Sequence, residues 1–248
     1  MKEWSKIVIF IESNCKDAAY HFSVEELFTR IIKPSEPVLM IWQTDKTVML
    51  GNNQIVNAEV NLDFASNENI KIVRRSSGGG AIYTDSGTVL YTTIQPLNKD
   101  AKYYREETAA NIIGVLETMG APAYREGRND ILLDGKKISG FAQYISGSHI
   151  CTHGSLLYDT DIEALTRVLI PSIEKLQPKG IASIRSRVTN IRPYIDNDYS
   201  IEEFIVALKN NLLIDNQYRE YKFSDEEMAK AENIRGTKYS NPEWNMSY

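Results

Sequence analysis

The sequence predicts an α+β protein in which a mixed, largely antiparallel β-sheet is flanked by helices. Short apolar, β-branched runs alternate with segments whose apolar residues repeat at helical spacing. Asp134-Gly135, the dipeptide that a tight type I′ turn prefers, lies between two extended runs in residues 130–145. Because the chain order mixes hairpins with helices, the α+β class is expected.

The first part of the chain predicts three strands and one helix. Apolar, β-branched runs indicate strands at residues 6–11, 37–42 and 46–50. Between the first two strands, residues 17–33 predict a helix with one buried face. The apolar residues of that face recur at helical spacing and are Val24, Leu27, Phe28, Ile31 and Ile32.

The remainder of the chain continues the mixture of strands and helices. Strands are expected at 70–75, at 88–94, on both sides of Asp134-Gly135 and at 150–158. A helix is expected over about 103–119, where Gly120 ends the apolar repeat, and another from Asp161. The sequences Ser200-Ile-Glu-Glu203 and Ser224-Asp-Glu-Glu227 have capping-box form and predict two further helices.

Composition excludes several classes of protein. The 248 residues fit one large domain, or one domain with a small appendage, and a hydrophobic content of 42% is enough for a sizeable core. A net charge of -5 disfavours a general nucleic-acid binder. The cysteines Cys15 and Cys151 cannot form a disulfide framework, and the three histidines form no zinc motif. No stretch approaches the length of a membrane span, so a cytoplasmic location is expected.

The segment RRSSGGG at residues 74–80, here called the glycine loop, has two interpretations. Three consecutive glycines expose main-chain N–H groups to a close ligand, while Arg74 and Arg75 supply positive charge, a combination suited to phosphate or carboxylate. A flexible turn is the alternative. The residues alone do not decide, because neither the Walker pattern nor G-x-G-x-x-G is present.

A second candidate element is GRND at residues 127–130, followed by Lys137 in KISG. A hairpin closed by Asp134-Gly135 places Asn129 and Asp130 near the level of Ser139 and Gly140, close to Lys137. Taken alone, Asp130 and Lys137 are more simply an exposed ion pair. Together with the glycine loop, they favour a nucleotide site in which the carboxylate holds a divalent cation and the ammonium holds a phosphate.

Other residues carry weaker signals. Cys151, His153 and Ser155 share one face of an expected strand, which raises a Cys–His nucleophile, although this spacing alone does not aim a thiol at an imidazole. Trp42 is either core or the wall of an acyl pocket. The run from Ser183 through Arg185 and Arg187 to Asn190 is either a solvated surface or an anion contact.

Together these segments resemble the lipoate-protein ligases, in the superfamily of biotin-protein ligases and lipoyl or octanoyl transferases. The matching stretches span most of the chain, in the family's order, and are WQTDKTVMLGNNQ (42–54), VRRSSGGGAIYTDSG (73–87), GRNDILLDGKKISGFAQ (127–143), HGSLLYDTD (153–161) and SIRSRVTNI (183–191). The resemblance implies the biotin/lipoate ligase catalytic fold, which is like that of class II aminoacyl-tRNA synthetases.

The same resemblance implies a reaction in two steps. Lipoate and ATP give lipoyl-adenylate, and a lysine of an acceptor protein then takes the lipoyl group. Lys137 is the implied catalytic residue, with Mg²⁺ at Asp130. The implied contacts to the substrate or adenylate are Trp42, Arg75, Ser77, Gly78, Gly79, Gly80, Asn129, Ser139, Gly140 and His153. Implied acceptors are lipoyl domains of 2-oxoacid dehydrogenase complexes or the glycine-cleavage H protein.

The chain also departs from the family pattern. Thr84 stands where many ligases have histidine, Phe141 replaces a small residue, and Tyr144 stands where some members have arginine, so the acyl substrate stays open between lipoate and octanoate. Residues 1–248 are expected to form a single catalytic domain without the C-terminal accessory domain of the long members, with adenylation dependent on a separate accessory protein.

Three alternatives remain from the sequence. An ATP-independent lipoyl or octanoyl transferase would pass the acyl group through a cysteine thioester, but neither cysteine lies where that nucleophile is expected. A biotin-protein ligase shares the Asn-Asp pair and the lysine but has a different glycine loop. A noncatalytic lipoyl- or nucleotide-binding relative would have no evident use for both Lys137 and Asp130.

Overall fold

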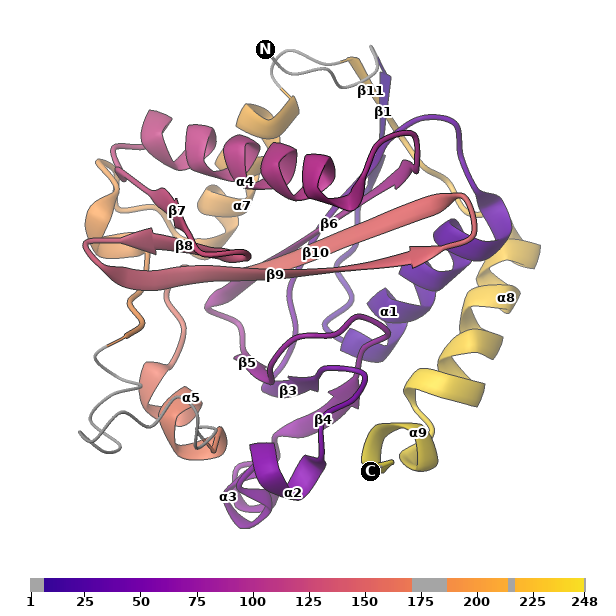
Figure 1. The fold of residues 1–248 in the computed structure, drawn as a ribbon, viewed down its shortest axis with the longest axis horizontal. Helices are drawn as coiled ribbons and strands as arrows, with labels where there is room; N and C mark the ends of the chain where they lie inside the picture. The colour runs from indigo at the N-terminus through magenta and orange to yellow at the C-terminus, as the bar shows by residue number, and fades with distance from the viewer. Residues whose placement is uncertain (1–6, 171–186, 214–216, 248) are drawn as a thin grey trace.

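A computed structural model describes residues 7–170, 187–213 and 217–247, and two β-sheets organise this part of the chain (Figure 1). The larger sheet has eight strands in the order β11-β1-β2-β6-β10-β9-β8-β7. Its strands are β1 (Ile7–Ile11), β2 (Val38–Trp42), β6 (Thr88–Pro96), β7 (Tyr124–Glu126), β8 (Asp130–Leu133), β9 (Lys136–Ser146), β10 (His149–Leu157) and β11 (Gln217–Glu220).

The pairing confirms the mixed, largely antiparallel sheet. β1 runs parallel to both β2 and β11, whereas the pairs from β2 through β6, β10, β9 and β8 to β7 are antiparallel. The long central strands β6, β10 and β9 hold the register that carries His153 opposite Thr92 and Ala142. The centre of the sheet is therefore the rigid part on which side chains can be positioned.

A separate three-stranded sheet lies below the larger one in the view of Figure 1. Its strands are β3 (Thr47–Leu50), β4 (Lys71–Arg74) and β5 (Ile82–Thr84), with β3 in the centre, parallel to β4 and antiparallel to β5. The glycine loop leaves the end of β4 and returns through β5. The small sheet thus presents this loop toward the larger sheet.

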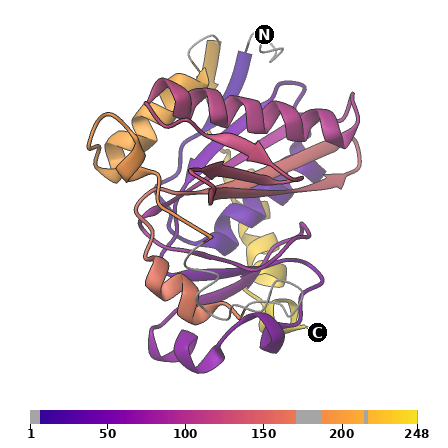
Figure 2. The same ribbon diagram turned by 60° about the vertical axis from the view of Figure 1, so that its left-hand side comes forward.

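Helices cover both faces of the larger sheet (Figures 1 and 2). Alternation along β1 sends Val8 and Phe10 into a core with α4 and α7, and Ile9 and Ile11 into a core with α1 and the C-terminal segment. The helical elements are α1 (Ala18–Leu27), η1 (Phe28–Ile32), α2 (Val56–Glu59), α3 (Leu62–Asn67), α4 (Ala101–Thr118), α5 (Ile162–Val168), η3 (Arg192–Tyr194), α7 (Ile201–Leu213), α8 (Asp225–Ile234), η4 (Arg235–Tyr239) and α9 (Pro242–Met246).

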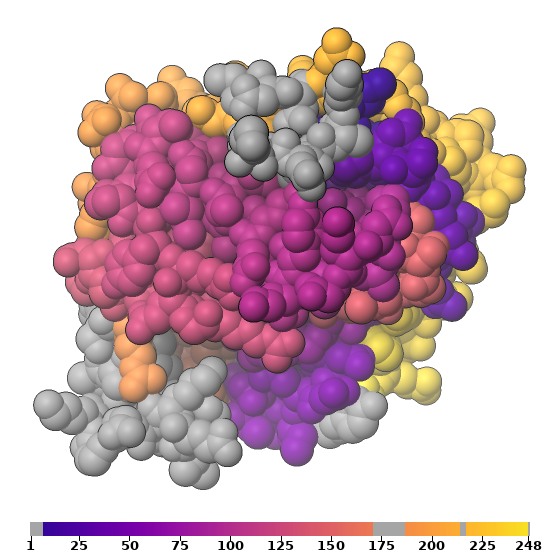
Figure 3. All heavy atoms as spheres, turned by 45° about the horizontal axis from the view of Figure 1, so that its top comes forward, coloured from indigo at the N-terminus to yellow at the C-terminus, as the bar shows by residue number. Residues whose placement is uncertain are grey.

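The small sheet has a core of its own. Val48, Leu50 and Tyr83 pack with α2, α3 and α5 in a third apolar cluster. In the space-filling view of Figure 3, α4 and the β7–β9 strands form one continuous surface, and residues of the small-sheet region project below it. No helix within the described residues is long and apolar enough to cross a membrane.

Local sequence signals explain where several elements begin and turn. Asp134 and Gly135 both have positive φ, 48° and 70°, as the predicted type I′ turn requires. Asp17 and Asp161 each accept a main-chain N–H at the start of a helix. The capping box at Ser224 is complete, which confirms the expected start of α8.

Other features differ from the sequence prediction. The helix over 17–33 divides into α1 and the π-helical turn η1, and α1 is buried on nearly all sides because the sheet, α8 and η4 surround it. Ile31, expected on the buried face, is 47% exposed. The sequence prediction also missed β5, β7, β11, the short helices α2 and α3, and the separation of β3 and β4 into a second sheet.

Candidate active site

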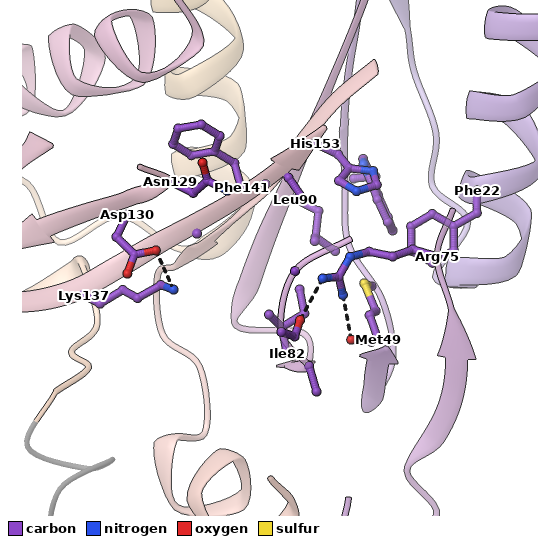
Figure 4. A pocket seen from close by; sticks show the side chains of 17 residues that line it. Phe22, Met49, Arg75, Ile82, Leu90, Asn129, Asp130, Lys137, Phe141 and His153 are labelled. Atoms are coloured by element: carbon purple, nitrogen blue, oxygen red, sulfur yellow. Dashed lines mark hydrogen bonds and ion pairs between the residues drawn. The ribbon is translucent and has the colours of Figure 1, made fainter. Parts of the chain in front are cut away.

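A cavity of about 240 Å³ lies where the larger sheet, the glycine loop and the β8–β9 hairpin meet (Figure 4). Its apolar wall comes from α1, β2, β3, β6 and the hairpin, and consists mainly of Phe22, Trp42, Met49, Leu90 and Phe141. Its polar groups come from Arg75, Asn129, Asp130, Lys137 and His153. We call this space the first cavity.

A second cavity of about 840 Å³ adjoins the first. Its wall includes Arg128, Arg187 and Glu126, so it is the more highly charged of the two. Five residues line both spaces: Gly80, Ala81, Asn129, Asp130 and Lys137. A molecule with an apolar end and an anionic end could therefore extend from one cavity into the other past Lys137.

Lys137 and Asp130 form an ion pair at this junction, with 2.8 Å between Nζ and Oδ1 (Figure 4). The hairpin register pairs Asp130 with Gly140, and an irregularity after Ile131 then pairs Leu132 with Lys137. A Cβ on Gly140 would lie 2.9 Å from Nζ of Lys137. Because Gly140 has no side chain, the ammonium end of Lys137 has room to lie against it.

The main chain of Lys137 is fixed on its other side by residues 187–189. Its N–H donates to the carbonyl of Arg187 at 2.7 Å, and its carbonyl accepts from the N–H of Thr189 at 3.1 Å. The side chain itself is 38% exposed. Lys137 therefore combines a fixed main chain with an ammonium group that faces both cavities.

Arg75 organises the glycine loop from within. Its guanidinium donates to the carbonyls of Met49, Gly78 and Gly80 at 2.7–2.9 Å, and Nε donates to Ser77 Oγ at 3.0 Å. Burial lowers the pKa of Arg75 to about 10, with the charge of Glu25 opposing that shift, so the group stays cationic at neutral pH. The loop is thus a structured element, and the flexible-turn alternative is not supported.

Arg74 is fully buried and belongs to the structural framework. Its side chain donates to the carbonyls of Gly51, Asn52, Gln54, Trp244, Asn245 and Ser247. From the sequence, both arginines of the loop are candidates to bind an anion. Because Arg74 lines neither cavity and points into main-chain carbonyls, that interpretation is wrong for Arg74.

A buried hydrogen-bond chain connects Ser77 to α1. Ser77 Oγ lies 2.6 Å from Nε2 of His153, and Nδ1 of His153 lies 2.9 Å from a carboxylate oxygen of Glu25. The carboxylate favours the tautomer with a proton on Nδ1, so that Nε2 can accept from the serine hydroxyl. Sequence reasoning missed Glu25, although a carboxylate beside Val24 in the apolar stripe of a helix is an unusual feature.

Glu25 also orients the aromatic wall. Trp42 donates from Nε1 to Thr92 Oγ1 at 3.0 Å, and Thr92 donates to Oε1 of Glu25 at 2.7 Å. The ring of His21 lies 4.3 Å from that of Trp42, on which it packs at a tilt of 31°. Trp42 is therefore both core and cavity wall, the two possibilities that the sequence left open.

The remaining predicted residues take different places. Gly79 and Gly80 line the first cavity, whereas Gly78 is exposed and lines neither. Gly79 has φ 93°, and a Cβ on Gly51 would overlap its carbonyl oxygen, so residues 51–54 pack directly against the loop. Ser139 is buried at 1% exposure and lines neither cavity.

Cys151 is a poor candidate for a nucleophile. It is fully buried in the core with α1 and lines neither cavity. Burial raises the pKa of its thiol well above the usual value, and the charge of Glu25 adds to that shift. Within the described residues, Glu25, Cys151 and His153 are the one close group of potential metal ligands, but both ring nitrogens of His153 already have hydrogen-bond partners.

The family departures also have structural places. Thr84 is buried and contacts Thr44, away from both cavities. Phe141 narrows the first cavity, and Tyr144 packs in the core near Cys151. Ser183 and Arg185 lie outside the described residues, while Arg187 lines the second cavity, as an anion contact would.

Fold and site together define a protein that can hold an apolar chain with an anionic head beside a lysine. The family model for the lipoyl protein ligase A/B catalytic domain matches residues 17–213, and the chain belongs to that family. Lipoate-protein ligase LplJ of Bacillus subtilis is 32% identical over 242 residues, which cover 96% of this chain and 73% of that protein. A lipoate–protein ligase of Streptococcus pyogenes is 35% identical over 219 residues, 85% of this chain and 64% of that one.

Solved structures share the fold. The bi-partite lipoate protein ligase of Thermoplasma acidophilum, described with its E2 lipoyl domain, superposes with a TM-score of 0.83 at 25% identity over 98% of this chain and 96% of that chain. A lipoate-protein ligase A bound with ATP has a TM-score of 0.82 at 24% identity, over 98% of each chain, a likeness that shows the fold alone. These neighbours confirm the expected catalytic fold.

Proposed function

We propose that this chain is a lipoate-protein ligase that makes lipoyl-AMP from lipoate and ATP and transfers the lipoyl group to a lysine of an acceptor lipoyl domain. The position of Lys137 at the junction of the two cavities carries the proposal. Family membership and the names of the similar ligases support it. The chain spans 73% and 64% of the length of those two relatives.

The two cavities suit the two parts of an acyl-adenylate. The first has an apolar wall for the acyl chain, including Trp42 and Leu90. The second carries Arg128 and Arg187, which can contact phosphate. In this arrangement the mixed anhydride lies beside Lys137, with Gly79 and Gly80 allowing close approach of the main chain.

In the first step, a lipoate carboxylate oxygen attacks the α-phosphorus of ATP, a new P–O bond forms, and pyrophosphate leaves with the electrons of the broken P–O bond. Two anions must approach each other, which is the main barrier at this stage. The ammonium of Lys137 lies where it can contact both the carboxylate and the α-phosphate and reduce their repulsion.

In the second step, the neutral ε-amine of the acceptor lysine attacks the carbonyl carbon of the anhydride. The C–O bond to AMP breaks, AMP leaves as the anion, and the amine proton passes to solvent. Negative charge develops on the carbonyl oxygen before that bond breaks. Lys137 can donate a hydrogen bond to this oxygen, so the same ammonium would serve both steps.

The residues at the junction also fit a magnesium ion. Asp130 supplies a carboxylate, and the buried Oδ1 of Asn129 has no hydrogen-bond partner within the described part of the chain. Hard oxygen donors of this kind suit Mg²⁺. When bound, the ion would neutralise phosphate charge during adenylation.

A thioester mechanism has little support in this chain. Cys151 is buried, lines neither cavity, and has a raised thiol pKa. An acyl group in the first cavity would instead lie beside Lys137 and His153. The ATP-dependent route therefore explains the site better than an octanoyl or lipoyl transferase that uses a cysteine.

For partners, the archaeal ligase described with its E2 lipoyl domain supports a lipoyl domain as acceptor, and its bi-partite organisation makes an accessory polypeptide a reasonable second partner. The glycine-cleavage H protein is a further candidate acceptor. An assay can supply the lipoyl domain, the H protein and the accessory polypeptide separately. Such an assay can distinguish a partner that is required for adenylation from one that is required for transfer.

The decisive experiment is intact-mass measurement of a lipoyl domain incubated with the purified chain, ATP, Mg²⁺ and lipoate. A parallel reaction receives synthetic lipoyl-adenylate in place of ATP and lipoate. The ATP reaction is run both in the absence and in the presence of an accessory polypeptide. We expect the acceptor to gain the mass of one lipoyl group in the adenylate reaction and in at least one of the two ATP reactions. If neither reaction modifies the acceptor lysine, the proposed function is wrong.

A further inference from the structure

Ser76 is the one serine of the glycine loop whose side chain contacts the C-terminal part of the described chain. Its Oγ lies 2.9 Å from Nζ of Lys238 and 2.7 Å from the hydroxyl of Tyr239. Both partners belong to η4, more than 160 positions away in the sequence. Ser76 lines neither cavity, so these contacts serve something other than direct binding.

Glu26 closes these contacts into a ring of hydrogen bonds. Its Oε2 accepts from Nζ of Lys238 at 2.7 Å and from the hydroxyl of Tyr239 at 2.8 Å. Lys238 can donate to both Ser76 and Glu26, while Tyr239 donates to Glu26 and accepts from Ser76, so every member is satisfied at once. We call Ser76, Glu26, Lys238 and Tyr239 the Ser76 cluster.

Two members of the cluster are well shielded from water, while the side chain of Lys238 is 27% exposed. Tyr239 is 1% exposed, and the side chain of Glu26 is 7% exposed. Burial by itself raises the pKa of the Glu26 carboxyl, but the hydrogen bonds from Lys238, Tyr239 and Arg30 and the charge of Lys238 together outweigh it, so the pKa is lowered. Hydrogen bonds to a shielded charge are stronger than exposed ones, so the cluster can hold the loop firmly.

A second attachment lies two residues earlier in the loop. Asn245 accepts the main-chain N–H of Arg74 at 2.8 Å, and Trp244 donates from Nε1 to the carbonyl of Arg74 at 2.8 Å. Residues 235–247 therefore hold the glycine loop at both Arg74 and Ser76. Arg75, which lies between these points, contacts the carbonyls of Gly78 and Gly80 and lines the first cavity.

We propose that Glu26, Lys238 and Tyr239 are positioning residues for the acyl-adenylate site, an inference that rests on the proposed function. They touch neither cavity, and they act through Ser76 on its neighbours Arg75 and Ser77. Without the cluster, the loop spends only part of its time in the binding conformation. The apparent dissociation constant then rises by the reciprocal of that fraction, while bound ligand restores the loop for catalysis.

The test compares Tyr239→Phe, Ser76→Ala and the double variant with a matched control, Tyr221→Phe. Tyr221 also donates a hydrogen bond to a glutamate, Glu227, but it does not contact the glycine loop. The readouts are binding of a nonhydrolysable lipoyl-adenylate analogue by calorimetry, the KM for lipoate, kcat, the melting temperature, and amide hydrogen exchange of residues 74–80.

We expect each single loop variant to weaken analogue binding and raise the KM for lipoate about three- to tenfold, with kcat changed less than twofold. Exchange should accelerate in residues 74–80, and the double variant should be no weaker than the worse single one. Tyr221→Phe should leave analogue binding and loop exchange unchanged, even if its melting temperature falls. Ser76→Thr should bind the analogue as tightly as the unmodified chain does, because threonine keeps the hydroxyl group.

Two results separate the possible failures. If the unmodified chain does not bind the analogue, the proposed function is wrong and this inference falls with it. If the unmodified chain binds but Tyr239→Phe and Ser76→Ala bind equally well, the site is as proposed and the positioning role is wrong. Additive losses in the double variant would likewise show that Ser76 and Tyr239 act separately.

Discussion

Nζ of Lys137 and Oδ1 of Asp130 lie 2.8 Å apart at the junction of the two cavities. Both side chains are partly exposed, so the ion pair itself contributes little to stability. In the proposed reaction, the ammonium of this pair lies between the acyl carbonyl and the phosphate.

Lys137→Ala should lower acyl transfer from synthetic lipoyl-adenylate by about 10²–10³-fold, since it removes the donor for the developing oxyanion. The melting temperature should change little because the side chain is partly exposed. Lys136→Ala is the matched control, because Lys136 is adjacent but lines neither cavity. Unchanged transfer in the Lys137 variant would exclude it as the catalytic residue.

Asp130→Asn should impair adenylation more than transfer. The substitution keeps the shape of the side chain but removes the charge that would attract Mg²⁺. We expect pyrophosphate exchange into ATP to fall about ten- to a hundredfold, by analogy with the loss of one charged contact. Transfer from preformed lipoyl-adenylate should fall much less. An equal loss in both assays would contradict a metal role confined to adenylation.

Glu25→Gln should disturb the wall of the first cavity. The carboxylate offers two acceptor oxygens, both near Nδ1 of His153 and one of them near the Thr92 hydroxyl. Glutamine removes the negative charge and replaces one of these oxygens with an NH₂ group, which would face a hydrogen-bond donor. The free energy of unfolding should fall by about 1–3 kcal/mol, and lipoate should bind more weakly in calorimetry. Glu107→Gln, a change on α4 far from the cavity, provides the control. Full lipoate affinity in the Glu25 variant would disprove the link to the wall.

Cys151→Ala should retain ATP-dependent lipoylation within about threefold of the unmodified chain. The thiol is buried and lines neither cavity, so its removal costs only packing, about 1 kcal/mol. Intact-mass measurement of the acceptor domain checks the activity, and a search for a thioester on the enzyme checks the mechanism. If a folded Cys151 variant transferred no lipoyl group, the result would support the alternative of a cysteine-dependent transferase.

Stability should fall as the pH is lowered from 7 to 5 because of His21. Burial lowers the pKa of His21 to about 4, with the hydrogen bond to the carbonyl of Cys15 opposing that shift. Between that value and the ordinary histidine pKa of about 6.5, the unfolded chain binds a proton that the folded chain excludes. The group therefore destabilises the fold as pH falls through this window, by about 2 kcal/mol at pH 5.

Urea unfolding of the unmodified chain and of His21→Gln at pH 7 and pH 5 checks this contribution. The variant should be less stable at pH 7 because it loses the ring that packs on Trp42. Its stability should also change less between the two pH values. An identical pH dependence in both proteins would show that His21 is not the group responsible.

The sequence alone predicted the parts of the fold that depend on local signals. Asp134-Gly135 marked the hairpin that brings Asp130 to Lys137, and Ser224 marked the start of α8. The small sheet was missed because its strands are joined through contacts between distant residues, and its three-residue strand β5 has little local signature.

The site was predictable to a similar extent. Lys137, Asp130, Trp42 and His153 do meet around one cavity. The two arginines of the glycine loop could not be told apart, because their difference arises from long-range contacts: Arg74 points toward residues 244–247, and Arg75 points into the loop itself. The role of Glu25 depends in the same way on the packing of α1 against β6 and β10.

The main chain of Lys137 donates a hydrogen bond to Arg187 and accepts one from Thr189, and these bonds have a consequence for the timing of the proposed reaction. A residue anchored at its backbone can move its charged tip only by rotating the four methylenes of its side chain. Such rotations take picoseconds to nanoseconds, far faster than a typical turnover. In the proposed reaction, the charge of Lys137 would therefore follow the reacting atoms from one chemical step to the next without any rearrangement of the fold.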